Sequence, residues 1–359
     1  MGKYTNIDDP SAHFQVALHS SANAATITND GNSDLQPDLI WSKSRTATHN
    51  HGLYDSTRGV TKFLSSNATS AETTASAGYD LTSFNTDGFS TGNNQYSTIC
   101  ANTGYVAWQW KANGGTTASN SDGSITSTVQ ADTDAGFSIV TFTSPASSGT
   151  GIFSVGHGLG QIPAMVITKS RVGTSNWWSW HKGLTGGNSN TSYIVALERI
   201  TAEGSYTNAW GAGMTSSVFG MQSGNTAVAS KDYVAYCFAE KQGYSKFGKY
   251  VGNGVTDGPF VYCGFKPAMV IMKRIDSTGS WHLFDNKRLG YNINNNVLLS
   301  DTNGAELAGA NYPFVDILSN GFKPRRATYD PNISGATYIF AAFAENPLVT
   351  STGIPTTAR

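Results

Sequence analysis

Charged residues are scarce in this chain of 359 residues, of which Asp, Glu, Lys and Arg together make up 13%. That share is about half of what soluble proteins usually carry. The 23 basic and 24 acidic residues nearly cancel and leave a formal net charge of −1. Nucleic acids and anionic membranes attract proteins through concentrated positive charge. We therefore expect no nucleic-acid partner.

Long apolar segments are also missing. Uninterrupted apolar runs do not exceed seven residues, the length of the run at 338–344, whereas a membrane-spanning helix needs about 20. The first residues lead into polar sequence without the apolar core of a signal peptide. We therefore expect a chain that is made in a cytoplasm and does not insert into a membrane.

Cysteine is rare, and the spacing of the cysteines shows no paired motif. Cys100, Cys237 and Cys263 lie far apart, and no CxxC motif is present. Neither a disulfide framework nor a zinc site fits this spacing. The pattern predicts buried free thiols, although one pair could still form a bridge.

Small and hydroxyl-bearing residues take the place of the missing charge. The chain has 39 Gly and many Ser, Thr and Asn residues, which favour strands and turns over helices. No long segment rich in Ala, Leu, Glu and Lys shows the 3.6-residue period of a helix. The composition predicts an all-β protein.

One motif occurs three times along the chain. Each copy has Pro, five mostly apolar residues and Lys, at 37–43, 163–169 and 267–273. An aromatic anchor follows each Pro at a nearly constant distance of 68, 70 and 71 residues, at Tyr105, Tyr233 and Tyr338. Similar spacing in three places predicts three copies of one unit.

Within a copy, short apolar runs and recurring turn signals are typical of strands. We expect three tandem antiparallel β-sandwiches of the jelly-roll or lectin type. Their predicted bounds are 1–112, 136–241 and 242–359, the last with a C-terminal tail. Residues 113–135, which are mainly small or polar, are predicted to form a linker.

Aligning the copies on the Pro brings three columns of side chains into register. The columns are His51, Trp177 and Trp281; Tyr54, Trp180 and Phe284; and Asp55, His181 and Asp285. The first and third copies then share an Asp-x-x-Arg motif, Asp55 with Arg58 and Asp285 with Arg288. Such a pair could anchor a polar ligand such as a sugar. It could equally be a structural salt bridge that holds a loop.

The second copy has Trp177, Trp178, Trp180 and His181 in place of this motif. Alternation along a strand sends Trp177 to one face and Trp178 and Trp180 to the other. An exposed indole could stack on a sugar ring, whereas buried ones would serve the core or a subunit contact. We treat these residues, together with Tyr54, as candidates for glycan or subunit contact.

The sequence contains little that indicates a metal site or an enzyme. His49 and His51 could place two imidazoles on one strand face, but a lone HxH is a weak metal motif and His51 shares a column with two Trp residues. No paired catalytic carboxylates, nucleophile elbow or phosphate-binding loop can be recognised. We expect no catalytic residues, no cofactor and no metal.

Several strings are similar to known sequences. They include TNIDDPSAHFQVAL at 5–18, YDSTRGVTKFLSSNATSAET at 54–73, FVYCGFKPAMVIMKR at 260–274 and STGIPTTAR at 351–359. They resemble repeat-containing virion structural or tail-fibre-like proteins of marine bacteriophages, including cyanophages. The resemblance covers essentially the whole chain and implies a virion component, without implying any catalytic residue.

These observations favour a non-enzymatic fibre or fibre-like adhesin that presents loops to glycan on the host surface. The alternatives are a purely architectural capsid decoration or tail connector, and a polysaccharide depolymerase. Expected partners are other virion proteins, further copies of the chain in a homotrimer, and host-surface glycan. The expected location is the virion.

Overall fold

The computed structural model describes residues 5–146, 151–289, 291–309, 315–327 and 329–356. In these ranges the regular structure is β-strand apart from two short 3₁₀ helices, η1 (Pro10–Ala12) and η2 (Gly187–Ser189). The predicted all-β class is confirmed. No helix in the described ranges is long and apolar enough to cross a membrane.

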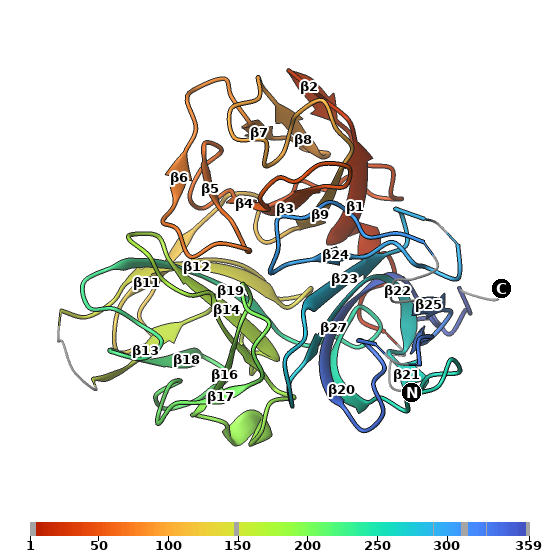
Figure 1. The fold of residues 1–359 in the computed structure, drawn as a ribbon. Helices are drawn as coiled ribbons and strands as arrows, with labels where there is room; N and C mark the ends of the chain where they lie inside the picture. Colours follow the sequence, from red (N-terminus) through yellow and green to blue (C-terminus); the bar gives the residue numbers. More distant parts are fainter. Residues whose placement is uncertain (1–4, 147–150, 290, 310–314, 328, 357–359) are drawn as a thin grey trace.

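The strands gather into three lobes around a common centre (Figure 1). We call them the first lobe (β1–β9), the second lobe (β10–β19) and the third lobe (β20–β27). Every pairing between labelled strands in the described part of the chain is antiparallel, as expected from the sequence.

The first lobe has one larger and one smaller sheet. Its strands are β1 (Phe14–His19), β2 (Ala25–Ile27), β3 (Leu39–Ser44), β4 (Gly52–Asp55), β5 (Lys62–Leu64), β6 (Thr73–Thr74), β7 (Leu81–Phe84), β8 (Phe89–Thr91) and β9 (Tyr105–Trp110). The larger sheet has the order β1-β9-β3-β4-β5-β6, and the smaller one β2-β8-β7.

The second lobe has the sheet with the most strands, eight. Its strands are β10 (Ala118–Asn120), β11 (Ser127–Asp132), β12 (Phe137–Thr143), β13 (Ile152–Gly156), β14 (Met165–Ser170), β15 (Trp178–His181), β16 (Tyr193–Ala196), β17 (Gly204–Ser205), β18 (Val218–Gln222) and β19 (Asp232–Phe238). The order is β10-β11-β12-β19-β14-β15-β16-β17, beside the pair β13-β18.

The third lobe repeats the division into two sheets. Its strands are β20 (Ser245–Val251), β21 (Val261–Tyr262), β22 (Phe265–Arg274), β23 (Trp281–Asp285), β24 (Leu298–Leu299), β25 (Val315–Leu318), β26 (Gly321–Pro324) and β27 (Thr337–Pro347). The orders are β20-β27-β22-β23-β24 and β21-β26-β25.

One strand order is common to the three larger sheets. The series β1-β9-β3-β4-β5 matches β12-β19-β14-β15-β16 and β20-β27-β22-β23-β24, position by position. In each series the strand carrying the Pro-to-Lys motif lies next to the strand that starts at or near the Tyr anchor. The sequence repeat therefore corresponds to a repeated set of strand pairings.

The predicted linker at 113–135 is where the structure differs from the sequence analysis. It contains β10 and β11, and β11 pairs with β12 along its length. Asp38 accepts hydrogen bonds from the backbone N–H groups of Ala112, Gly114 and Gly115 at 2.7–2.9 Å. The fully buried Gln130 accepts a further one from Gly115 at 2.8 Å. These polar anchors order a segment that has too few large apolar residues to be recognised as strand.

The strands with continuous apolar runs are buried on both faces. In β3, Leu39 and Trp41 point into a central cluster, whereas Ile40 points into a cluster between the two sheets of the first lobe. The central cluster also takes Ile167 from the second lobe and Ile271 from the third. All three lobes therefore share one core at the centre, and each lobe has its own outer core.

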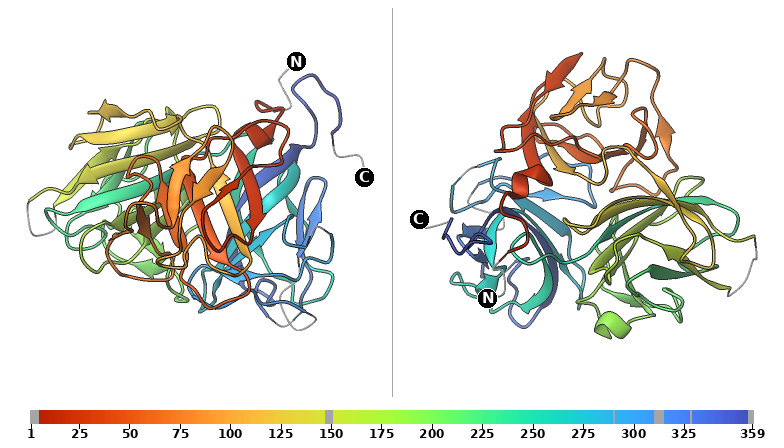
Figure 2. Two further views of the ribbon diagram at one scale, coloured as in Figure 1. Left: turned by 90° about the horizontal axis from the view of Figure 1, so that it is seen from above. Right: turned by 180° about the vertical axis from the view of Figure 1, so that it is seen from behind.

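The two ends of the described chain come together beside the third lobe (Figure 2). There Ser351 donates its backbone N–H to Asp8 Oδ1 at 2.6 Å and its hydroxyl to Asp8 Oδ2 at 2.5 Å. The cysteines lie elsewhere in the cores, all three buried and unbridged, which confirms their prediction as free thiols.

Candidate functional site

The Asp–Arg pair predicted in the first copy forms at the end of β4, inside the protein. Arg58 donates its backbone N–H to Asp55 Oδ1 (2.8 Å) and its Nε–H to Asp55 Oδ2 (2.5 Å). Its Nη2–H reaches the carbonyl oxygen of Leu53 at 2.8 Å. Neither charged side chain is accessible to solvent, so this pair does not meet an external sugar and instead holds the loop after β4.

Two groups extend this pair to the second lobe. The hydroxyl of Tyr236 on β19 donates to Asp55 Oδ2 at 2.8 Å and accepts from Arg58 Nη2 at 3.1 Å. Glu72 accepts from Arg58 Nη1 at 3.0 Å and from Nε and Nη2 of Arg171, each at 2.9 Å. Burial would raise the pKa of Glu72, but its bonds to Arg171 and the charge of Arg58 hold that pKa below its usual value.

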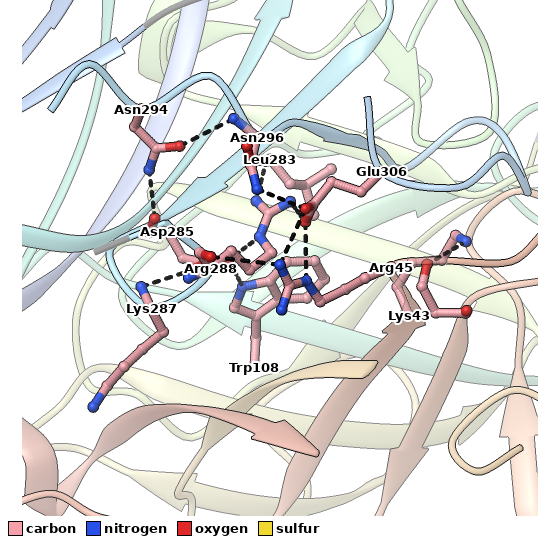
Figure 3. A network of polar contacts seen from close by, with 11 residues as sticks. Lys43, Arg45, Trp108, Leu283, Asp285, Lys287, Arg288, Asn294, Asn296 and Glu306 are labelled. Carbon is pink, nitrogen blue, oxygen red and sulfur yellow. Dashed lines mark hydrogen bonds and ion pairs between the residues drawn. The ribbon is translucent and has the colours of Figure 1, made fainter. Parts of the chain in front are cut away.

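The pair in the third copy has the same geometry at the end of β23 (Figure 3). Arg288 donates its backbone N–H to Asp285 Oδ1 (2.9 Å), its Nε–H to Asp285 Oδ2 (2.6 Å) and its Nη2–H to the Leu283 carbonyl oxygen (2.6 Å). Both charged side chains are again inaccessible. Here the neighbour is Trp108 on β9 of the first lobe, whose Nε1–H donates to Asp285 Oδ2 at 3.0 Å.

A glutamate also joins the third lobe to the first. Glu306 accepts from Arg288 Nη1 at 3.0 Å, and from Nε and Nη2 of Arg45, each at 3.2 Å. Its backbone N–H donates to the Arg45 carbonyl oxygen at 2.7 Å. Glu72 makes the equivalent backbone bond to Arg171 at 3.0 Å. The same Asp–Arg–Glu–Arg chain therefore crosses two of the three boundaries between lobes.

At the boundary between the second and third lobes, the equivalent backbone hydrogen bond forms, but among the described residues no arginine pairs with the glutamate. Glu203 donates its backbone N–H to the carbonyl oxygen of Ile275 at 2.9 Å. Its carboxylate accepts hydrogen bonds from the backbone N–H and the hydroxyl of Thr185. Ile275 occupies the position where the other two boundaries have an arginine, so the charge network is absent there.

The column of His51, Trp177 and Trp281 also connects the lobes. Trp177 Nε1–H donates to the Ser65 carbonyl oxygen in the first lobe at 2.8 Å, and Trp281 Nε1–H to Ala196 in the second at 2.9 Å. His51 Nε2 lies 3.0 Å from the Leu299 carbonyl oxygen in the third lobe. A carbonyl only accepts, so His51 Nε2 carries the proton. All three rings are buried and each donates to the next lobe around the centre.

The other aromatic candidates are interior or partly covered. Trp177 and Trp180 lie in different clusters, as alternation predicts, and both are inaccessible, which excludes them from sugar stacking. Trp178 is half-buried, with Tyr206 6.0 Å away between ring centroids. Tyr54 is buried and its hydroxyl lies 2.6 Å from Thr98 Oγ1.

His181 takes the place of the aspartate in the second copy. Its Nε2 lies 3.0 Å from the carbonyl oxygen of Phe340 on β27 of the third lobe, and its Nδ1 accepts the Gly183 N–H at 2.9 Å. Burial disfavours the charged imidazolium and lowers the pKa of His181 to about 3. A neutral histidine therefore joins the second and third lobes where Asp–Arg pairs serve the other boundaries.

The weak metal candidates do not form a cation site. His49 is half-buried and both it and His51 precede β4 rather than lying on a strand. His51 Nδ1 accepts the Nε1–H of Trp41 at 2.9 Å, so both of its ring nitrogens are occupied. No group of three or more metal-ligating side chains was found among the described residues.

The lysine that ends each repeated motif is buried, and two of the three lysines reach another lobe. Lys169 Nζ donates to the carbonyl oxygens of Thr69 (2.9 Å) and Ser175 (2.8 Å) and to Ser175 Oγ (3.0 Å). Lys273 Nζ likewise has three carbonyl acceptors, one of them Ile200 of the second lobe. Lys43 Nζ has a single acceptor among the described residues, the Ser44 carbonyl oxygen at 2.9 Å. Burial lowers the pKa of each lysine to about 8.

The sequence analysis missed the partners that complete these networks. They are Glu72, Arg171, Tyr236, Arg45 and Glu306. A detectable signal existed for the arginines, because Arg45 and Arg171 both lie eight residues after their motif proline. The glutamates lie in loops of different length, so alignment on the proline does not superimpose them.

Taken together, these side chains make closed contacts rather than a reactive centre. The buried aspartates and arginines are paired and hydrogen-bonded, which is the condition under which ions persist in an interior. Each network begins in one lobe and ends in the next. Of the predicted contact residues, the two Asp–Arg pairs, Trp177 and His181 therefore hold lobes against one another, whereas Tyr54, Trp178 and Trp180 pack within their own lobes.

Comparison with known proteins gives a family without an assigned activity. Residues 9–347 match the model of a family described as a domain of unknown function, DUF7483. No curated protein and no solved structure matches the chain. Because the match extends over nearly the whole chain, the protein belongs to the DUF7483 family.

Proposed function

We propose that the chain is a non-enzymatic structural protein of a bacteriophage virion, built from three tandem β-sandwich copies and acting as a fibre-like surface adhesin. The shared strand order of the three larger sheets supports the threefold repetition. A smaller sheet or strand pair accompanies each larger one and encloses an outer core, as in a sandwich.

A structural role is supported by one observation above all: the charged side chains of the two Asp–Arg pairs serve contacts between lobes. Asp55, Arg58, Asp285 and Arg288 are all sequestered from solvent, so their charges are unavailable to a substrate. Interlocked side chains and a shared core oppose rotation of one lobe against another. A rigid body of this kind suits a component that carries load or holds loops in fixed positions.

The virion setting and the adhesive role draw on the sequence. The strings at 5–18, 54–73, 260–274 and 351–359 resemble phage structural proteins, and the low charge leaves a surface rich in hydroxyl and amide groups. Such groups form hydrogen bonds with neutral sugars, and this binding does not require charged groups to lose their hydrating water. Weak individual sites become effective when many copies are presented together.

A capsid decoration or tail connector is the second candidate. It is favoured by the finding that the predicted contact residues serve packing rather than an exposed ligand site. A surface adhesin must be accessible on the particle, whereas a connector is covered by other virion proteins.

Labelling the chain in intact particles and measuring adsorption of the purified protein to host cells tests the proposal. We expect the label on an exposed appendage, and binding of the protein to host cells that competes with phage adsorption. A chain enclosed by other virion proteins, or one that never binds host cells, would contradict the adhesive role. Shortening of host polysaccharide by the purified chain would instead support a depolymerase.

Self-association into a homotrimer is part of the proposal. Light scattering on the purified chain distinguishes the states, because one chain has a mass of 38.1 kDa. A mass of about three chains supports the trimer. A single-chain mass would mean that the three lobes of one chain already supply the threefold arrangement.

A further inference from the structure

A polar groove runs along the third lobe and reaches the first lobe at one end, outside the contacts described above. Three adjoining hollows of about 260, 190 and 590 Å³ form it. All three share Glu345 as a lining residue, the first two share Asn286, and the last two share Lys266 and Asn292. At about 590 Å³ the largest hollow is within the range of pockets that hold small ligands, about 300 to 1,000 Å³, and the other two are smaller.

This groove depends on a feature of the third lobe that the other lobes lack. Strands β22 and β27 contain 10 and 11 residues, against 6 in β3, β9 and β14 and 7 in β19. The additional pairing lies beyond an irregularity at Pro267, where Lys266 pairs with Asn346 and Phe265 with Pro347. The strand extension therefore supplies Lys266, Glu345 and Asn346 to the groove.

The charges in the groove cancel locally. Lys266 Nζ lies 2.6 Å from Glu345 Oε2, and Lys287 Nζ lies 2.8 Å from both carboxylate oxygens of Asp30. Among the described residues, no other charged side chain lines the three hollows. An anionic or cationic ligand would find no unpaired counter-charge, so the lining favours a neutral ligand.

Amides are the commonest uncharged polar side chains in the lining. The asparagines are Asn32, Asn286, Asn292, Asn294, Asn320 and Asn346. Asn292 exchanges two hydrogen bonds with the backbone of Ile317, which fixes the wall of the groove. Asn286 Oδ1 is shielded from solvent and has no hydrogen-bond partner in the described part of the chain. Because buried acceptors are normally satisfied, this oxygen is suited to a donor hydroxyl of a ligand.

Exposed aromatic rings are concentrated in the same lobe. Among the described residues, the four most exposed aromatic side chains are Phe260, Tyr262, Tyr291 and Tyr329, all in the third lobe. Tyr291 lines the groove and is 69% exposed. Tyr262 pairs with Gly321, next to the groove residue Asn320. An exposed phenol ring offers an apolar face for a sugar ring and a hydroxyl for a hydrogen bond.

We infer that this groove binds a neutral oligosaccharide, with Tyr291 stacking on one sugar ring and the asparagine amides bonding its hydroxyl groups. The inference rests on the proposed adhesive function and names its ligand class and its place on the chain.

Binding of the purified full chain to immobilised oligosaccharides tests it. The probes are neutral oligomers of glucose, galactose, mannose and N-acetylglucosamine, with sialylated and sulfated oligosaccharides beside them. We expect binding to at least one neutral probe, and affinity about tenfold weaker in Tyr291→Ala and in Asn320→Ala, as loss of one good contact implies. Tyr329→Ala is the matched control, since Tyr329 is 58% exposed in the same lobe but does not line the groove.

The thermal unfolding midpoint of each variant shows whether it is folded. Neutral-probe binding that survives both groove substitutions would overturn the inference while leaving adhesion standing. Binding to anionic probes alone, or to no probe, would overturn it as well. A chain that binds neutral probes through the groove but not host cells would support the groove and refute the adhesive function.

Discussion

Arg58 shows how much depends on single residues at the boundaries between lobes. Its guanidinium contacts Asp55, Glu72, Leu53 and Tyr236 and is fully buried. Arg58→Met would leave the Asp55 carboxylate in the interior without its counter-ion. Removal of one partner from a buried pair costs about 3–5 kcal/mol. We expect a loss of that size in the free energy of unfolding, measured by chemical denaturation.

Lys246→Met is the matched control for this substitution. Lys246 pairs with Glu240 at 2.8 Å, but its side chain is 37% exposed, and surface pairs of this kind contribute less than about 1 kcal/mol. Equal losses in the two variants would show that the Asp55–Arg58 pair does not stabilise the contact between lobes.

The three buried lysines allow a sharper comparison. Lys169 has three acceptors, whereas Lys43 has one among the described residues. Lys169→Met should lower the free energy of unfolding by about 1–3 kcal/mol, because it leaves buried oxygens without donors. Lys43→Met should be neutral or stabilising, because it removes a poorly solvated charge. Denaturation of both variants at pH 7 measures the difference.

The pH dependence of the free energy of unfolding tests the prediction for Lys43→Met independently. In the folded chain the pKa of Lys43 is about 8, against 10.5 for an ordinary lysine. Between these values the unfolded chain binds more protons, so this lysine makes stability rise with pH. The advantage of Lys43→Met over the wild type should therefore be largest below pH 8 and shrink as pH approaches 10.5. A difference that stays constant over this window would contradict the assigned burial of charge.

At the scale of elements, β11 is the strand whose role is least evident from its composition. Gln130 on β11 accepts hydrogen bonds from Asn113 and Gly115 and donates to Ser56 and Thr57 of the first lobe. Gln130→Ala should lower the free energy of unfolding by about 1–3 kcal/mol. It should also make residues 111–120 sensitive to limited proteolysis.

Thr128→Ala is the control on the same strand, since Thr128 is exposed. It should leave both the unfolding midpoint and the cleavage pattern unchanged. Cleavage within 111–120 in the wild-type chain, at the rate seen in Gln130→Ala, would restore the interpretation of this segment as a linker.

Local sequence patterns predicted the strands better than they predicted the polar groups that the side chains contact. Short apolar runs such as the one at 164–167 predicted strands, and this one lies at the start of β14, which is buried on both faces. The column of His51, Trp177 and Trp281 placed three equivalent side chains, but not the carbonyl groups that they reach. Those acceptors come from other copies, and no spacing within one copy encodes them.

Burial could not be deduced from residue type for the polar candidates. Arg58 and Lys266 look alike as isolated cations, yet the first is buried at a boundary between lobes and the second lines an open groove. The difference arises from the arrangement of the lobes. The groove itself depends on the extension of β22 and β27 past Pro267, which no local pattern marks as longer than its counterparts.

The central cluster makes the whole molecule more than three adjacent lobes. Ile167 and Trp177 of the second lobe lie in it with Trp41 of the first and Ile271 of the third. A separated lobe would expose its share of this cluster to water, at about 25 cal/mol for each Å² of apolar surface. Its outer core alone must then offset the conformational entropy of the ordered chain.

We therefore expect residues 113–241, which contain the whole second lobe, to lack a cooperative unfolding transition when produced alone, whereas the full chain unfolds in a single one. Circular dichroism and hydrogen exchange measure both. Adding 1–112 and 242–359 to the fragment should restore exchange protection in β14 and β19, because these strands face the shared centre. Cooperative unfolding of the isolated fragment would show instead that the outer core is sufficient and that the lobes are independent domains.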